Sequence, residues 1–235
     1  MEIKKVFFPL AGIVFCFLIF MAIYKNKSSG NKLYSTIEAI SLMDNIYQDI
    51  SGFTIQEQER NLIEQAGGNA TYGEIKPESL AQILDYFKLS ASDVFVDLGS
   101  GVGKACVQVA LTTPAKAIGI ELSTSRHEAA EMIRKELLNR NILTDNKKLQ
   151  FFKENIAEAD LSKATHVFMC STCFSDDLMK KIADNIALMD RQIYVITLRQ
   201  LPPSEFATFK EEKVFTLPMT WSANTPVYVY KKELL

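Results

Sequence analysis

A glycine-rich turn that follows a short apolar run most constrains the fold of this 235-residue chain. The run, residues 94–98 (VFVDL), is rich in β-branched and aromatic residues, as a buried strand requires. Glycines then alternate with other residues, at Gly99, Gly101 and Gly103. Glycine lets the backbone approach a ligand where any Cβ would clash. The segment therefore predicts a strand, a ligand-binding turn and a helix, the opening unit of an α/β fold.

A second apolar run, residues 117–120, ends in Glu121. The carboxyl ends of neighbouring parallel strands meet at one edge of a sheet, and a carboxylate there can accept both hydroxyls of a ribose. The two runs together indicate a nucleotide-type cofactor. The simpler interpretation, that the turn only joins a strand to a helix, explains neither the glycine spacing nor the acid.

The glycine spacing narrows the class of cofactor. The dinucleotide fingerprint is G-x-G-x-x-G, whereas the third glycine here comes one residue earlier. A Walker loop needs glycine five residues before its Gly-Lys pair and Ser or Thr after it. Around Gly103-Lys104 those two positions hold Leu98 and Ala105. The remaining pattern resembles the cofactor loop of class I S-adenosylmethionine-dependent methyltransferases, whose cofactor carries no phosphate.

This resemblance implies S-adenosyl-L-methionine as the cofactor and identifies the residues that bind it. The candidates lie in the glycine loop, after the second apolar run and after a third run at 149–153; they are Asp97, Gly99, Ser100, Gly101, Gly103, Glu121, Leu122, Asn155 and Ile156. Such enzymes place an acidic residue near the adenine amino group, where this chain has Asn155. An asparagine can still accept a hydrogen bond there through its amide oxygen.

Apolar runs alternate with amphipathic helical segments after residue 93, which predicts a mostly parallel, Rossmann-like α/β sheet. The expected strands are residues 94–98, 117–120, 149–153, 167–170 and 193–197, and the expected helices are residues 37–50, 77–87, 104–111, 123–139 and 175–188. Two last strands, 214–217 and 227–230, follow each other without a helix and predict a C-terminal antiparallel hairpin. Ser125 and Glu128 are spaced for a capping box.

An uncharged apolar run, residues 6–24, lies between lysines near the N-terminus. Its length suits one transmembrane helix, and no small-x-small site for signal-peptide cleavage follows it. A buried core helix is the other interpretation. We expect residues 1–24 to be a membrane anchor, 25–70 a linker with N-terminal helices and 71–235 the methyltransferase domain. Since S-adenosylmethionine is held in the cytosol, we expect a single-pass protein with its catalytic domain on the cytosolic side.

Composition excludes some functions. The formal net charge is −2, so nothing indicates a nucleic-acid partner. The chain has two histidines, which makes a histidine-rich metal site improbable. Cys170 and Cys173 have the spacing of half a zinc site, but no second pair exists. We therefore expect no bound metal and interpret this pair as small residues where a buried strand ends.

Three further segments narrow the resemblance. Tyr72-Gly73-Glu74 precedes the glycine loop, residues 173–179 (CFSDDLM) lead into a helix, and residues 220–222 (TWS) stand shortly before 226–228 (PVY). This order resembles the disruptor-of-telomeric-silencing family of non-SET lysine methyltransferases over residues 72–230. The hydrophobic N-terminus, short lid segment and glycine loop are also similar to membrane-anchored lysine methyltransferases of the ATP synthase c-subunit.

These resemblances imply a protein lysine as the methyl acceptor. They make Tyr72 and Glu74 candidates for a lid over the cofactor, with catalytic roles. The first family has an asparagine after strand four that lines the lysine channel; here the matching stretch is 170–172 (CST), so Ser171 and Thr172 become the candidates for the acceptor channel. Aromatic side chains can dehydrate such a channel and lower the pKa of the lysine; the candidates are Tyr72, Phe174, Trp221 and Tyr228.

Two other functions stay open. The missing channel asparagine is compatible with a small-molecule or lipid methyltransferase that uses the anchor to reach its substrate. A cofactor-binding domain without catalysis, acting as a membrane-tethered interaction module, is the third interpretation.

Overall fold

The computed structural model describes residues 31–204 and 208–233. The chain divides into residues 1–31 and residues 32–235, and the second part is described below. The expected anchor, residues 6–24, lies outside the described residues. Among those that are described, no helix is long and apolar enough to cross a membrane.

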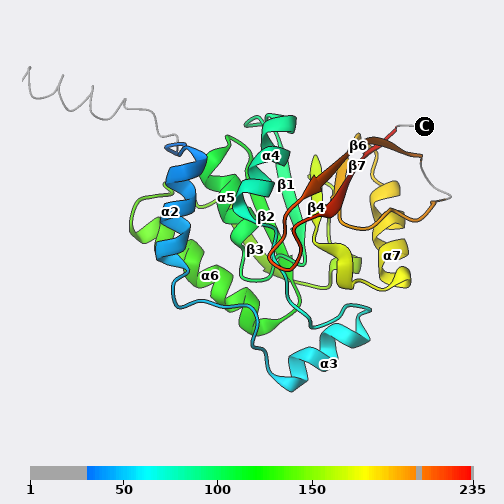
Figure 1. Ribbon diagram of the computed structural model, residues 1–235, viewed down its shortest axis with the longest axis horizontal. Coiled ribbons are helices and arrows are strands. Elements are labelled where there is room, and N and C mark those ends of the chain that lie inside the picture. The colour runs from blue at the N-terminus through cyan, green and yellow to red at the C-terminus, as the bar shows by residue number, and fades with distance from the viewer. Residues whose placement is uncertain (1–30, 205–207, 234–235) are drawn as a thin grey trace, which may run out of the picture. The chain divides into compact units, whose positions relative to one another are not determined.

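One seven-stranded sheet organises the second unit, with the strand order β3-β2-β1-β4-β5-β7-β6 (Figure 1). Its strands are β1 (Val94–Leu98), β2 (Lys116–Glu121), β3 (Leu149–Lys153), β4 (His166–Met169), β5 (Tyr194–Thr197), β6 (Phe209–Leu217) and β7 (Thr225–Lys232). Strands β1 to β5 pair in parallel, whereas β7 is antiparallel to both β5 and β6. The predicted parallel sheet and antiparallel C-terminal hairpin are confirmed, with hairpin strands longer than expected.

Helices cover both faces of the sheet (Figure 1). The helices of the described residues are α2 (Thr36–Ile46), α3 (Glu57–Gln65), α4 (Pro77–Phe87), α5 (Lys104–Thr112), α6 (Thr124–Asn139) and α7 (Asp176–Ala187), with 3₁₀ turns η1 (Ile156–Glu158) and η2 (Ser171–Cys173). Helices α2, α4, α5 and α6 share one apolar core with the sheet, and α7 shares the other. Phe95 enters the first core and Val96 the second, because successive strand residues face opposite sides.

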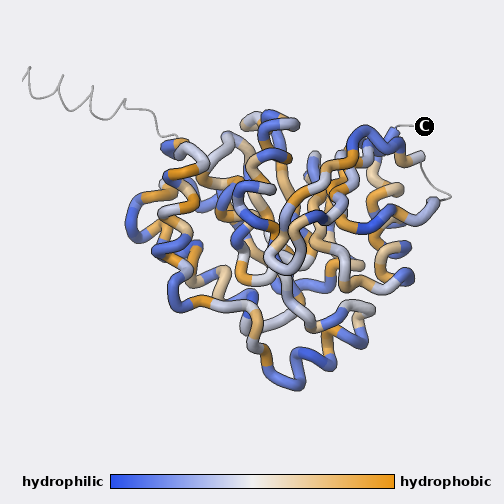
Figure 2. Tube along the Cα trace, viewed as in Figure 1, coloured by the Kyte–Doolittle hydropathy of each residue, from blue (hydrophilic) through white to orange (hydrophobic). Residues whose placement is uncertain are grey.

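Helix α3 is the element that the sequence did not predict. It lies apart from the two helical layers (Figure 1), and it is largely hydrophilic (Figure 2). Only Ile63 of this helix is buried, so no apolar periodicity reveals it. Its carboxylate Glu59 accepts hydrogen bonds from the backbone N–H and hydroxyl of Ser125, both at 2.7 Å. Tertiary contacts rather than an amphipathic stripe therefore hold α3 in place.

The predicted capping box of α6 is wrong. Ser123 is the N-cap, and its hydroxyl accepts from the N–H of Arg126. Ser125 instead donates to Glu59 of α3. Burial alone would raise the pKa of Glu59, but these hydrogen bonds hold it below its usual range. A carboxylate from another helix has thus taken the place that Glu128 would have in a local box.

The glycine loop turns through three left-handed residues, Gly99, Gly101 and Gly103, with φ of 83°, 55° and 87°. At Gly103 a Cβ would lie 2.4 Å from Cζ of Phe151, and at Gly101 it would lie 2.5 Å from Cε2 of Tyr72. The sequence explained these glycines by close approach of a ligand. The structure corrects this explanation for Gly101 and Gly103, because side chains of the protein itself occupy the space.

We expect Gly103→Ala to lower the free energy of unfolding by about 2–5 kcal/mol. A left-handed alanine costs about 1–2 kcal/mol, and the contact with Phe151 adds about 1–3 kcal/mol of overpacking. Urea denaturation measures the change, and a double-mutant cycle with Phe151→Leu separates the two causes. If the clash contributes, the double variant should lose less stability than the two single variants lose together. Additive losses would contradict it.

Candidate functional site

Two neighbouring cavities open at the carboxyl edge of the parallel strands. The larger has a volume of about 640 Å³, part of it open to solvent, and the smaller about 360 Å³. Both are lined by Tyr72, Gly73, Gly99 and Cys170. The sheet order reverses between β1 and β4, whose ends meet here, and ligands of open α/β sheets bind at such a switch point.

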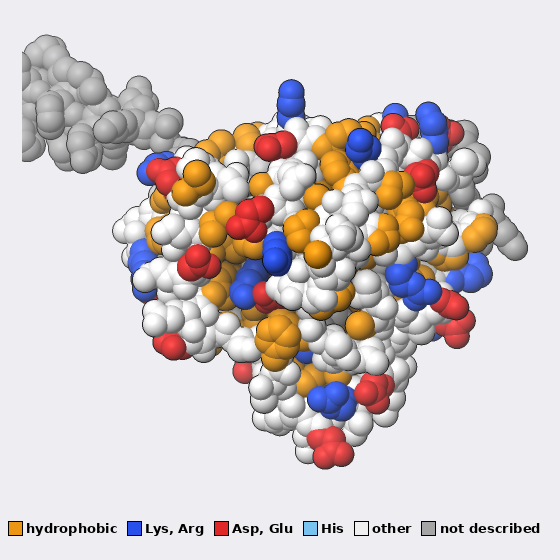
Figure 3. All heavy atoms as spheres, in the orientation of Figure 1, with side chains coloured by type: hydrophobic (Ala, Val, Ile, Leu, Met, Phe, Trp, Pro, Cys, Tyr) orange, Lys and Arg blue, Asp and Glu red, His pale blue; other side chains and the backbone are white. Residues whose placement is uncertain are grey.

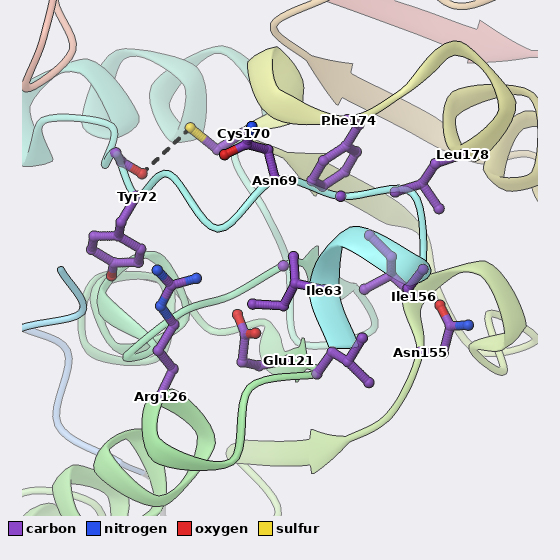
Figure 4. Close-up of a pocket in the computed structure, with 15 residues that line it drawn as sticks. Ile63, Asn69, Tyr72, Glu121, Arg126, Asn155, Ile156, Cys170, Phe174 and Leu178 are labelled. Carbon is purple, nitrogen blue, oxygen red and sulfur yellow. Dashed lines mark hydrogen bonds between the residues drawn. The ribbon is translucent and has the colours of Figure 1, made fainter. Parts of the chain in front are cut away.

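Glu121 lies in the larger cavity at the end of β2 (Figure 4). It is only 6% exposed. One carboxylate oxygen accepts from the backbone N–H of Gly101 and the other from that of Ser123, both at 2.8 Å. Each oxygen keeps a free lone pair after these bonds. The carboxylate therefore supports the glycine loop and still offers the paired acceptors that a ribose diol needs.

One side of the same cavity, beyond Glu121, is largely apolar, and Asn69 and Arg126 line the cavity as well. The predicted Leu122, Asn155 and Ile156 line it, together with Ile63, Phe174 and Leu178. The side-chain oxygen of Asn155 accepts from the backbone N–H of Ala157 at 3.1 Å and caps η1. It retains one acceptor position for an adenine amino group. This arrangement of a diol acceptor beside an apolar slot suits an adenosine.

Asp97 lines the smaller cavity with Ser100. Asp97 is 4% exposed, and its Oδ1 has no hydrogen-bond partner among the described residues; the hydroxyl of Ser100 likewise has none. Burial, with the nearby Glu121 charge, raises the pKa of Asp97 to about 8. A buried polar atom without a partner is costly, so these two groups suit a ligand that can hydrogen-bond to them.

Lys104, which the sequence did not single out for binding, lines the same smaller cavity at the first turn of α5. Its ammonium lies 2.8 Å from Oε2 of Glu74. The other oxygen of Glu74 accepts from the hydroxyl of Tyr72, also at 2.8 Å. Glu74 lines the smaller cavity as well, and its catalytic role stays a prediction.

We call residues 47–76 the lid: α3 with the flanking segments 47–56 and 66–76. The β6–β7 loop holds its last part, because Thr220 and Glu74 exchange hydrogen bonds at 3.0 and 3.1 Å. The ring of Trp221 packs against Gly73, where a Cβ would lie 2.4 Å from its Cζ3. Trp221 is 45% exposed at this place. Of the four predicted channel aromatics, Tyr72 and Phe174 line the larger cavity.

Ser171 and Thr172 are not brought to either cavity. Ser171 is fully buried, its hydroxyl bonds to that of Thr197 at 2.7 Å, and it accepts from the N–H groups of Leu198 and Arg199. Thr172 is exposed. Within the stretch 170–172, Cys170 lines both cavities instead. Its sulfur contacts the carbonyl of Gly73 at 3.7 Å. Its place directly after β4 was the available signal, because strand ends carry ligand-binding residues in such sheets.

The residues present fit S-adenosylmethionine. Its ribose diol matches Glu121, its adenine matches the apolar slot at Ile156, and its ammonium matches the unpartnered oxygen of Asp97. Lys104 offers a positive charge to its carboxylate in the same cavity as Asp97. The two cavities adjoin through Gly99, where a Cβ would lie 3.3 Å from Phe174.

Comparisons with known proteins agree with this site. The family model described as "Histone methylation protein DOT1" matches residues 53–221. A curated relative from Aspergillus fumigatus, "Histone-lysine N-methyltransferase, H3 lysine-79 specific", is 25% identical over 173 residues, which are 70% of this chain and 34% of the relative. The protein of the same description from Caenorhabditis elegans is 50% identical over 54 residues, 23% of this chain and 6% of the relative. The chain therefore spans about a third or less of these relatives.

A solved structure shows the same fold. Magnesium protoporphyrin IX methyltransferase from Synechocystis, with bound S-adenosylmethionine, superimposes with a TM-score of 0.51. The alignment covers 86% of this chain and all of the other, at 12% sequence identity. The predicted class I methyltransferase fold and its cofactor are confirmed. The similarity to the ATP synthase c-subunit enzymes stays a prediction.

Proposed function

We propose a function from one premise: this chain belongs to the family described as histone methylation protein DOT1, and its family match contains the glycine loop, Glu121 and Trp221. The proposed reaction is methyl transfer from S-adenosylmethionine to the side-chain nitrogen of a lysine in a protein. The observation that carries the proposal is the pair of buried carboxylates, Glu121 and Asp97, in adjoining cavities under an aromatic lid.

The cofactor supplies an activated methyl group on a sulfonium, and the protein has to hold the acceptor in line with it. Such positioning is worth roughly 7–11 kcal/mol. Glu121 and Asp97 would hold the donor at two separated points, and Tyr72, Phe174 and Cys170, which line the cavities, would exclude water between them. The aromatic surroundings also disfavour the charged form of a lysine, whose unperturbed pKa is roughly 10.4.

Glu74 is better suited to positioning than to proton transfer. Both of its oxygens have partners, the ammonium of Lys104 and the hydroxyl of Tyr72. Burial and the Glu74 charge raise the pKa of Tyr72 well above its usual range, so Tyr72 stays neutral. The acceptor lysine then loses its proton to water before transfer, and Tyr72 orients the lid.

Histone H3 is the first acceptor to test, because the curated relatives are described as specific for a lysine of that protein. The chain carries a net charge of −2, and on the face drawn in Figure 3 its Lys and Arg side chains are scattered among Asp and Glu. Nucleosome binding by DNA contact requires concentrated positive charge. We therefore expect free histone, or another protein, to be methylated at least as well as nucleosomes.

Labelling identifies the acceptor class. The full chain is incubated with methyl-labelled S-adenosylmethionine and, separately, with histone H3, nucleosomes and a membrane extract. Label on protein lysines, located by mass spectrometry, supports the proposal. Label in lipids or small molecules supports the second candidate, which the absence of the channel asparagine from residues 170–172 favours. Cofactor binding by calorimetry without any transfer would indicate the non-catalytic interaction module, and absence of binding would reject all three.

We also propose that residues 6–24 anchor the protein in a membrane with the catalytic domain on the cytosolic side. The support is the uncharged length of that run and its flanking lysines. The full chain should stay in the membrane pellet after carbonate extraction, and its domain should be digested by protease added from the cytosolic side. Uncleaved protein in the soluble fraction would contradict the anchor.

A further inference from the structure

Arg126 is a buried cation in an unfavourable place. It is the third residue of α6, so it lies in the first turn, where the helix dipole disfavours positive charge. It is 6% exposed. The partners that the described residues give it are two backbone carbonyls and an aromatic ring, not a carboxylate. A buried arginine of this kind needs a reason in the contacts that it makes.

The two carbonyls belong to the two ends of the lid. Nε of Arg126 donates to the carbonyl of Gly52, in segment 47–56, at 2.9 Å. Nη2 donates to the carbonyl of Ala70, in segment 66–76, at 2.9 Å. One planar guanidinium therefore joins the segment that enters α3 to the segment that leaves it.

The aromatic ring is that of Tyr72. The guanidinium carbon lies 4.6 Å from the ring centroid, and Figure 4 shows the Arg126 side chain rising between Tyr72 and Glu121. Tyr72 donates to Glu74, which pairs with Lys104 of α5. The contacts thus run across the cavity from α6 to α5.

The Tyr72 ring is tightly packed between two glycines, Gly52 and Gly101. A Cβ on Gly52 would lie 2.4 Å from its Cζ, and one on Gly101 would lie 2.5 Å from its Cε2. The ring is therefore held between the lid backbone and the cofactor loop, with Arg126 against its face. Releasing Arg126 frees the two segments that flank α3, while Glu59 still ties α3 to Ser125 of α6, and it removes the support of the ring at the same time.

We propose that Arg126 is a positioning residue that holds the lid closed in advance over the cofactor cavity and so sets the affinity for S-adenosylmethionine. Arg126 itself lines the cavity, and the lid that it orders carries Ile63 and Tyr72, which line it as well. A lid ordered before binding removes part of the entropy cost of binding. This inference rests on the proposed function only in assigning the cavity to that cofactor.

The test compares Arg126→Lys and Arg126→Met with Arg134→Met in the full chain. Arg134 lies on the same helix and pairs only locally, with Glu131. Lysine keeps the charge but cannot span both carbonyls in the planar geometry of arginine. Calorimetry with S-adenosylhomocysteine gives Kd. We expect both Arg126 variants to weaken binding about 10- to 30-fold, and Arg134→Met to bind as the wild type does.

Two further readouts separate positioning from general stability. Trp221 is the single tryptophan of the chain and packs on Gly73 of the lid, so acrylamide quenching of its emission reports lid release well below the unfolding temperature. We expect stronger quenching in the Arg126 variants, reversed by excess S-adenosylhomocysteine. In the methylation assay, KM for the cofactor should rise while kcat at saturating cofactor stays within about twofold of the wild type.

The proposal would be overturned if Arg126→Lys showed the Kd and the quenching of the wild type. Should Arg126→Met fail to fold, the result for Arg126→Lys alone is decisive. A loss of kcat at saturating cofactor with KM unchanged would overturn it as well. If the wild type binds no S-adenosylhomocysteine, the proposed function is wrong, and the quenching comparison alone still decides whether Arg126 holds the lid.

Discussion

Asp97→Asn will remove the pH dependence of cofactor affinity that we expect in the wild-type protein below pH 8. The pKa of Asp97 is raised to about 8 by burial and by the Glu121 charge. We expect the cofactor ammonium to bind the ionised carboxylate, so each pH unit below about 8 should weaken binding about tenfold. At pH 8 the asparagine variant should bind roughly 100-fold more weakly than the wild type, because a buried ammonium loses its counter-charge.

Calorimetry with S-adenosylhomocysteine from pH 5.5 to pH 8 measures this dependence, together with the proton released on binding. The asparagine variant should show a flat profile and no proton release in this range. A slope that persists in Asp97→Asn would assign the titration to another group. A wild type with a flat profile would show that Asp97 is already ionised in the free protein.

The same raised pKa fixes the sign of a stability effect. Between roughly pH 4, the ordinary range of an aspartate, and pH 8, native Asp97 holds a proton that the unfolded chain has lost. Raising the pH through this window therefore lowers the free energy of unfolding of the cofactor-free protein. Asp97→Asn should lessen that decline in urea denaturation, and cofactor should oppose it in the wild type.

Glu121→Gln is the second change with a large expected effect. Glutamine has one acceptor oxygen, so it cannot accept from both Gly101 and Ser123 as the carboxylate does. It also weakens both hydrogen bonds to the ribose diol, and bonds to a charged group contribute about 1.5–3 kcal/mol each. We expect Kd for S-adenosylhomocysteine to rise about 30- to 100-fold, or roughly 2–3 kcal/mol.

The matched control is Glu128→Gln, an exposed carboxylate on α6 that makes the same chemical change away from the cavity. It should bind as the wild type does. A probe that lacks the 2′-hydroxyl separates the two roles of Glu121: it should lose affinity for the wild type but little for the glutamine variant. Equal losses in both proteins would mean that Glu121 acts only by supporting the loop.

The sequence predicted the sheet well because each strand carries its own signal. Residues 94–98 and 149–153 are strands with the expected bounds, since apolar β-branched and aromatic runs report burial locally. Glu121 drew notice because it ends such a run, and Asp97 because it belongs to the loop that carries the resemblance; both line the cavities at the edge where ligands bind. Ser171 was misplaced because a short polar side chain after a strand can face the ligand or the core, and only packing decides between them.

The lid required the tertiary structure. Helix α3 has one buried apolar residue, so no apolar periodicity in the sequence predicts it. In the sequence, Arg126 cannot be distinguished from a surface arginine of a helix, because its two carbonyl partners belong to distant segments. The sequence alone determined the cofactor class, through glycine spacing and strand-end acids, because those features are contiguous along the chain. The tertiary structure alone decided that Gly101 and Gly103 make room for Tyr72 and Phe151. It also decided that Arg126 holds the lid, because these contacts join residues that lie far apart in the sequence and become neighbours only when the chain packs.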